Sequence, residues 1–185
     1  MAQFIDERKV DEYLTRLRQG ESSALDRLYE LTSKAIYSIA YTYLHDPHDS
    51  ADALSDTYLA IVKNIDKYKG SSSYNWIYTI TKNICLNMLR DKKKTVSVDF
   101  NDEETVNVLH LDSEDAPRVS DESGIIGIAK EVLKEKEFRV VILHAVNGMK
   151  FKEIADLTGG LEASVRWQYN NALKKIKAAY ERRNV

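Results

Sequence analysis

Cysteine, proline and glycine are scarce in this 185-residue chain, and each scarcity limits what the protein can be. The single cysteine, Cys85, excludes an internal disulfide framework and a multi-cysteine zinc site. Because there are only two prolines and seven glycines, few positions interrupt a helix. We therefore expect an all-α protein.

Long apolar runs and a secretion signal are also missing. No stretch approaches the roughly 20 apolar residues that cross a bilayer, and the N-terminus lacks the basic-then-apolar pattern of a signal peptide. Hydrophobic residues make up 43% and charged residues 30% of the chain, a composition typical of a soluble globular protein. The sequence predicts a cytoplasmic protein without membrane insertion.

Motifs for catalysis are absent from the sequence. The four histidines are scattered, with no His-Glu-x-x-His spacing for zinc. No glycine-rich loop is present to hold the phosphates of ATP, and Cys85 lies in a predicted helix where a packed thiol is expected. We predict no cofactor, no metal and no enzyme activity.

Charge is distributed unevenly along the chain, although the net charge is only −2. Residues 99–124 contain nine acidic side chains against one basic side chain, Arg118, whereas residues 125–185 contain 12 basic and seven acidic side chains. The acidic stretch lacks helical periodicity. We therefore predict two small helical domains, 1–95 and 125–185, joined by a flexible acidic linker at 96–124.

Apolar residues at helical spacing predict four helices in the first domain, near 10–17, 25–44, 49–65 and 74–90, which bury one shared core. Gly20 ends the first, and a turn at 45–48 separates the second from the third. In the third helix the aspartates are predicted to face outward and the apolar residues inward. The aspartates are Asp49, Asp52 and Asp56, and the apolar residues are Leu54, Tyr58, Ile61, Val62 and Ile65.

The fourth predicted helix has two contrasting faces. At about 100° per residue, an apolar face opposes a stripe of Tyr74, Tyr78 and Lys82. The apolar face consists of Ile77, Ile80, Ile84 and Met88, with Trp76 at the edge of this face, and the stripe is flanked by Asn75, Thr79 and Asn83.

Aromatic rings beside cationic and amide groups suit single-stranded nucleic acid. Each unpaired base that stacks on a ring contributes about 1–3 kcal/mol. Lys82 and the basic cluster that begins at Arg90 would bind phosphates. The alternative is that Trp76 is a core residue and the tyrosines merely cover the surface, and this domain alone does not decide between them.

The second domain ends in a predicted helix-turn-helix over residues 151–176. Ala155 is small where two helices cross, and Gly159 follows four residues later, where the turn needs a positive φ angle. On the second helix, Arg166 suits guanine and Gln168 suits adenine in a major groove, with phosphate contacts from the lysines that follow. The alternative is a helical hairpin used only for packing or for protein contacts.

Both halves, in this order, resemble the sigma-70 family of RNA polymerase sigma factors, in its small extracytoplasmic-function group. Residues 68–94 resemble region 2, through Trp76, Ile77, Ile80, Asn83 and Arg90. Residues 147–176 resemble region 4, through Gly148, Glu153, Ile154, Ala155, Gly159, Ser164, Val165, Arg166, Ala172, Lys174 and Lys175. The order of the two motifs and the linker between them make the combination specific.

The resemblance implies a non-catalytic subunit that directs promoter-specific transcription initiation, with three sets of site residues. Polymerase core binding is implied for Asp49, Asp52, Leu54, Asp56, Tyr58 and Val62. Binding and melting of the −10 element are implied for Tyr74, Asn75, Trp76, Tyr78, Thr79, Lys82, Asn83 and Arg90. Reading of the −35 element is implied for Ser164, Arg166, Trp167, Gln168, Asn170, Lys174 and Lys175.

The implied partners are core RNA polymerase, through its β′ clamp helices and β flap, and promoter DNA. Many members of the family are held inactive by an anti-sigma factor, which makes such a protein a candidate partner. The chain departs from the family pattern at Lys134 and Phe138, where Pro and Arg are common, and at Asn170 and Asn171. Two other hypotheses remain at this point, a helix-turn-helix repressor or activator and a helical adaptor that binds only protein.

Overall fold

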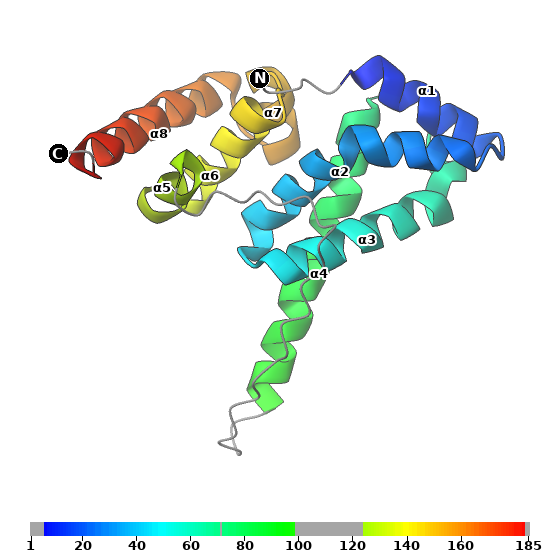
Figure 1. Cartoon of the computed structure of the whole chain (residues 1–185), viewed down its shortest axis with the longest axis horizontal. Helices are drawn as coiled ribbons and strands as arrows, with labels where there is room; N and C mark the ends of the chain where they lie inside the picture. The colour runs from blue at the N-terminus through cyan, green and yellow to red at the C-terminus, as the bar shows by residue number, and fades with distance from the viewer. Residues whose placement is uncertain (1–5, 71, 99–123, 184–185) are drawn as a thin grey trace.

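The computed structural model describes residues 6–70, 72–98 and 124–183, and all its regular elements in these ranges are helical. The helices form two groups that lie side by side, α1–α4 and α5–α8, with the end of α4 extending away from both (Figure 1). The all-α prediction is confirmed. The predicted acidic linker falls almost wholly on 99–123, outside the described residues.

The first group is a four-helix arrangement around one core. It consists of α1 (Glu7–Arg18), α2 (Ser23–Leu44), α3 (Pro47–Asn64), the short turn η1 (Ile65–Lys67) and α4 (Ser73–Val98). Leu14, Leu28, Ile36 and Ile61 are each at most 1% exposed and meet in this core. The helices begin and end near the predicted positions, except that α4 continues past Arg90 to Val98.

The second group is built on its last and longest helix. It consists of α5 (Ile125–Val132), α6 (Glu135–Val141), the π-helical turn η2 (Ile142–Val146), α7 (Phe151–Thr158) and α8 (Glu162–Arg183). The helices α5, α6 and α7 all pack on α8. Phe138, Ile142 and Ala172 are each at most 2% exposed in the core that results.

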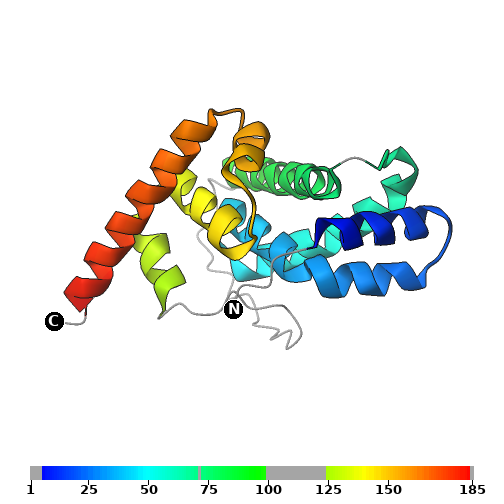
Figure 2. The same ribbon diagram turned by 90° about the horizontal axis from the view of Figure 1, so that it is seen from above.

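A further apolar cluster joins the two groups. Ile39 and Tyr43 of α2 and Tyr78 of α4 pack with Val140 and Leu143 of the second group. Seen from above, the second group (yellow to red) lies against one end of the first (Figure 2). The two predicted domains are therefore in direct contact in this structure.

Candidate nucleic-acid interface

The helix α3 presents an acidic face that begins at a well-formed N-terminus. The side chain of Asp46 accepts a hydrogen bond from the backbone N–H of Asp49 at 2.9 Å, and Pro47 occupies the first turn. Downstream, Asp52 and Asp56 are both exposed. They are one helical turn apart and lie on the same side of α3.

The other four residues implied for polymerase binding have different surroundings from Asp52 and Asp56. Leu54 and Tyr58 are 4% and 8% exposed, and the Tyr58 hydroxyl forms a 2.7 Å hydrogen bond with Thr32, so both belong to the core. Asp49 pairs with Lys92 of α4. The prediction that Val62 faces inward is wrong, because its side chain is 44% exposed.

The start of α4 is held by aromatic packing. The Trp76 ring lies 5.1 Å from the ring of Tyr68, centroid to centroid, and the Tyr68 hydroxyl donates to Asp11 of α1. Trp76 is half-buried by this contact. The ring is therefore fixed in position while part of its surface still faces solvent, as a stacking platform requires.

The exposed tyrosine stripe predicted on α4 is not present in this structure. Tyr78 is only 2% exposed, and its hydroxyl forms a 2.8 Å hydrogen bond with the hydroxyl of Tyr43. Tyr74 is half-buried and its hydroxyl is fully buried. Burial raises the pKa of both phenols, so both stay neutral. The prediction of exposure is wrong because Tyr43 of α2 and the second helical group cover this side of α4.

The remaining residues implied for the −10 element form a polar surface along α4. Thr79, Asn83 and Arg90 are exposed, and Asn75 is half-buried. Lys82 is half-buried and lines a cleft of about 500 Å³ between the two helical groups. This surface presents amide, hydroxyl and cationic groups.

The helix-turn-helix has the geometry that the sequence predicts. Gly159 ends α7 in the left-handed conformation, with φ at 70°, and apart from the two adjacent residues no described heavy atom lies within 4 Å of where a Cβ would be. Ile154, Ala155 and Val165 are each at most 4% exposed where α7 crosses α8. At the start of α7, Glu153 accepts a 2.8 Å hydrogen bond from the backbone N–H of Lys150.

The first turns of α8 present their side chains outward. Trp167 is 66% exposed, and Gln168 is half-buried. Arg166 pairs with Glu162 at 2.8 Å and lies over the Phe151 ring at 5.0 Å. Its guanidinium therefore lies at the surface. Because an exposed ion pair is weak, the guanidinium can leave Glu162 and bind another acceptor. The other exposed members of the predicted set are Ser164, Asn170 and Lys174.

Lys175 differs from the rest of that set because its ammonium is already engaged. It donates to both carboxylate oxygens of Glu137 at 2.7 Å, and Asn171 donates to the same carboxylate at 3.1 Å. Glu137 is 8% exposed. The hydrogen bonds from Lys175 lower the pKa of the Glu137 carboxyl, so the pair stays ionised. An outward phosphate contact by Lys175 requires this pair to break.

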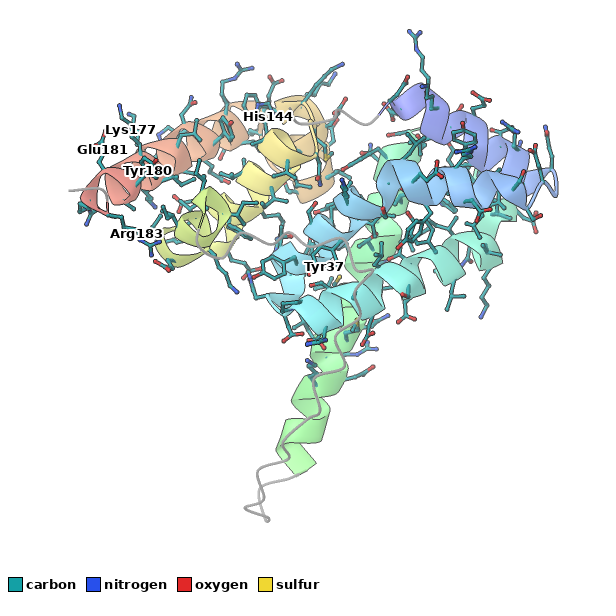
Figure 3. The ribbon with its side chains drawn as sticks, in the orientation of Figure 1. Tyr37, His144, Lys177, Tyr180, Glu181 and Arg183 are labelled. Carbon is teal, nitrogen blue, oxygen red and sulfur yellow. The ribbon has the colours of Figure 1, made fainter. Side chains whose placement is uncertain are left out.

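Sequence reasoning missed two groups of residues that position α8. One is Glu137. The only sign of its role in the sequence is that it is an acidic residue in a basic domain. The other is a ring cluster in which His144 lies 4.0 Å from Phe151 and 4.6 Å from Tyr169, between centroids. In Figure 3, His144 is close to the junction of α7 and α8, whereas Lys177, Tyr180, Glu181 and Arg183 gather at the far end of α8. The sign of this cluster in the sequence was one aromatic residue in α7, Phe151, and one in α8, Tyr169.

The histidine, cysteine and acidic side chains are dispersed over the described residues. In the part of the chain that the structure describes, histidine, cysteine and acidic side chains nowhere gather into a set that could hold a metal ion. Cys85 is fully buried, and burial raises the pKa of its thiol to about 12, so it stays protonated. No helix within the described ranges is long and apolar enough to cross a membrane.

Comparisons with known proteins match both halves of the chain. The family model for sigma-70 region 2 matches residues 28–95, which include α3 and most of α4. The family model for sigma-70 region 4 matches residues 129–176, which include the helix-turn-helix. Together the two matches cover more than half of the chain, in the order that the resemblance predicts.

Individual relatives agree with these matches. The chain is 21% identical over 160 residues to the ECF RNA polymerase sigma factor SigM of Bacillus subtilis, covering 85% of this chain and 96% of that protein. Among solved structures, it is similar to CnrH in complex with the cytosolic domain of CnrY, with a TM-score of 0.61, 17% identity and coverage of 94% and 97%. It is also similar to RpoE in complex with the anti-sigma factor NepR from Bartonella quintana, with a TM-score of 0.63, 16% identity and coverage of 84% and 96%.

Proposed function

Because the chain belongs to the sigma-70 family of RNA polymerase sigma factors, in its extracytoplasmic-function group, we propose a division of labour between its two helical groups. Membership of the family makes the chain a transcription initiation factor, and such factors act as non-catalytic subunits. The finer proposal is that residues 1–95 bind the polymerase core and the −10 element. Residues 125–185 read the −35 element, and residues 96–124 link the two.

Polymerase binding is assigned to the exposed face of α3. Asp52 and Asp56 provide negative charge there, and Leu59 and Val62, 69% and 44% exposed, provide apolar surface on the same helix. An exposed apolar patch with a charged border is typical of a protein-binding surface. The proposed contact of this face is with the β′ clamp helices. Leu54 and Tyr58 support α3 from inside the core and do not touch the partner.

Capture of the melted −10 strand is assigned to α4. Trp76, Thr79, Asn83, Lys82 and Arg90 are at least partly exposed and extend along the helix. Bases would stack on the Trp76 ring, and the cations would meet phosphates. Strand opening is then driven by captured bases, without nucleotide hydrolysis. Tyr78 is only 2% exposed and Tyr74 is half-buried in this structure, so neither is assigned to this surface.

Duplex reading of the −35 element is assigned to the outward face of α8. Arg166 and Gln168 are proposed to contact base edges in the major groove, and Lys174 is proposed to contact phosphate. The opposite face of α8 is packed on α5, α6 and α7, and this fixes the direction in which the outward face points. The β flap of polymerase is proposed as the second protein contact of this group.

The single observation that carries the proposal is the presence, in one chain, of an exposed acidic α3 and an exposed helix-turn-helix recognition face. Each contact alone is weak. Two linked contacts act together, because binding of one raises the effective concentration of the other. A repressor would require only the helix-turn-helix surface. An adaptor that binds only protein would show no salt-sensitive DNA binding.

The decisive experiment is run-off transcription with core RNA polymerase and a promoter library. We expect the purified chain to direct transcription from a subset of promoters with related upstream and downstream elements. There are two controls. One is core polymerase alone, and the other is core polymerase with a shortened chain that lacks residues 125–185. A chain that binds duplex DNA but directs no transcription by core polymerase would support the repressor hypothesis instead.

An anti-sigma protein is proposed as a further partner. One of the similar solved structures holds its sigma factor in complex with the anti-sigma factor NepR, and the other holds CnrH with the cytosolic domain of CnrY. We expect a protein of this kind to compete with core polymerase for the chain. Co-purification of the tagged chain from its own cells, followed by competition against core polymerase, tests this.

A further inference from the structure

Tyr68, which follows the turn η1 and precedes α4, is bound by α1 at both of its ends. Arg18 Nη1 donates to the backbone carbonyl of Tyr68 at 2.7 Å, and the Tyr68 hydroxyl donates to Asp11 Oδ1. Arg18 and Asp11 are seven residues apart, which corresponds to about 10 Å along a helix. Tyr68 therefore lies along α1, fixed at its backbone and at the far end of its ring, and is only 1% exposed.

The first residue of α4 is attached to the same side of α1. Ser73 Oγ donates to the backbone carbonyl of Glu7 at 3.3 Å. At about 100° per residue, Glu7, Asp11 and Arg18 fall within about 40° of one another around the helix axis. One line of α1 thus contacts the chain both before and after the loop that joins η1 to α4.

The backbone of this loop depends on such support. Gly70 has a φ of 72° and Ser72 has a φ of 49°. A left-handed conformation is unfavourable for a residue with a Cβ, such as serine, and it persists where the surrounding structure fixes it. The Ser72 carbonyl accepts a hydrogen bond from the backbone N–H of Trp76 at 3.1 Å, in the first turn of α4. The position of Trp76 therefore depends on a loop that α1 holds on both sides.

The Trp76 ring rests on the residue that α1 binds. It lies 5.1 Å from the Tyr68 ring, between centroids, with 49° between the two planes. Val10 and Leu14 of α1 are fully buried in the core against which Trp76 packs, so α1 is itself firmly anchored. A ring that is already held in its binding orientation binds more tightly, because less conformational entropy is lost on binding.

We propose that α1 positions the Trp76 ring for the melted −10 strand, and that Arg18 and Asp11 are positioning residues that act through Tyr68. The inference rests on the proposed function, because it takes Trp76 as a ring on which an unpaired base stacks. The match to sigma-70 region 2 begins at residue 28 and includes none of α1. Arg18 and Asp11 do not touch the strand: they fix Tyr68, and Tyr68 fixes Trp76.

Strand binding by the assembled complex tests the role of Arg18. Labelled oligo(dT) is titrated with the chain bound to core polymerase, and binding by core polymerase alone is subtracted. We expect Arg18→Met to weaken binding about tenfold, comparable to the loss of one base–ring stack. Arg18→Lys keeps a donor for the Tyr68 carbonyl and should restore most of the affinity. Arg27→Met is the matched control, because Arg27 is an exposed arginine of α2 that pairs with Glu30 of the same helix.

The salt dependence of the same titration separates positioning from direct contact. A side chain that neutralises one phosphate of a single strand contributes about 0.7 to the slope of log K against log salt. We expect Arg18→Met to lower the affinity and to leave this slope unchanged. A slope that falls by about 0.7 would show that Arg18 itself binds the strand, and this result would overturn the proposal.

The fluorescence of Trp76 reports the position of its ring without DNA. The chain has two tryptophans, so Trp76 is the remaining one in a Trp167→Phe background. We expect Arg18→Met and Tyr68→Phe each to shift the emission to longer wavelength and to increase quenching by acrylamide, with helical circular dichroism unchanged. Tyr68→Phe keeps the packed ring and removes the hydrogen bond to Asp11. Emission and quenching that stay unchanged in both variants overturn the proposal.

Trp76→Ala distinguishes failure of this inference from failure of the proposed function. If Trp76→Ala weakens oligo(dT) binding and Arg18→Met does not, α1 has no positioning role and the proposed function stands. If Trp76→Ala has no effect, the strand-binding role of Trp76 is overturned, and the inference fails with it. Equal weakening by Arg18→Met and Arg27→Met also overturns the inference, because it would show an effect of overall charge.

Discussion

The carboxylate of Glu137 on α6 accepts hydrogen bonds from the ammonium of Lys175 on α8, with 2.7 Å between Nζ and each oxygen. Lys175 and its neighbour Lys174 are adjacent in sequence and were both predicted to contact phosphate. The structure separates them, because Lys174 is exposed whereas Lys175 is turned toward α6. The pair joins two helices of the second group and fixes how α8 is presented.

This difference predicts unequal salt dependence for two lysine variants. Each phosphate that the protein neutralises contributes about 0.9 to the slope of log K against log salt. We expect Lys174→Gln to reduce the slope for duplex DNA containing the upstream element by about 0.9. Lys175→Gln should leave it unchanged, because Glu137 already neutralises that ammonium. Fluorescence anisotropy at several salt concentrations measures both, and an equal loss of slope would show that Lys175 contacts DNA.

The same pair predicts how stability depends on pH. The folded-state pKa of Glu137 lies below its ordinary value of 4.5. The stabilisation is therefore complete above the unfolded-state pKa and is lost as pH falls through the folded-state pKa. We expect Glu137→Gln to lower the free energy of unfolding at pH 7 by about 1.5–3 kcal/mol, the range for hydrogen bonds to a charged group. The gap from the unmodified chain should narrow as pH falls from 4.5 through the lowered folded-state pKa.

Urea unfolding at pH 7 and at pH 3.5 provides the measurement. Glu181→Gln is the matched control, because its pair with Lys177 on α8 is exposed and 3.8 Å long. It should change stability by less than about 1 kcal/mol at either pH. A Glu137→Gln deficit that persists unchanged at the lower pH would show that packing, and not the ion pair, causes the loss.

The acidic face of α3 predicts a separation between binding and stability. Asp52→Ala with Asp56→Ala removes two exposed charges that form no ion pair with any other residue that the structure describes. We expect affinity for core polymerase to fall by about tenfold or more, as for paired charges at an interface, with the unfolding midpoint nearly unchanged. Asp26→Ala, an exposed aspartate on α2, is the control. Equal affinity in all three chains would place the polymerase contact elsewhere.

Two adjacent glycines predict opposite tolerance to alanine. Gly159 has a φ of 70°, so Gly159→Ala should lower the free energy of unfolding by about 1–2 kcal/mol, the cost of a left-handed conformation with a Cβ. A Cβ on Gly160 would lie 3.7 Å from Thr158 Oγ1, an ordinary contact, and no positive φ applies there. Gly160→Ala should therefore be close to neutral. Thermal unfolding of both variants tests this, and similar losses would contradict the turn geometry.

Several features of the fold were predictable from local sequence. Leu14, Leu28 and Ile61 each belong to a different series of apolar residues at helical spacing, and all three are buried as expected. Gly159 ends α7 with the positive φ angle that its position in the helix-turn-helix pattern predicted. These succeed because helix periodicity and turn conformation depend on residues within a few positions of each other. The uncharged run at 35–44 was an overlooked sign that α2 needs cover on every side.

The amino-acid sequence alone thus determined the helices, their turns, the two-part organisation and the family. Only the tertiary structure decided that Tyr78 is covered, that Leu54 and Tyr58 support α3 from within, and that Lys175 is paired. The reason is physical. Whether a side chain faces solvent depends on what lies opposite it, and the partners here are up to 109 positions distant along the chain.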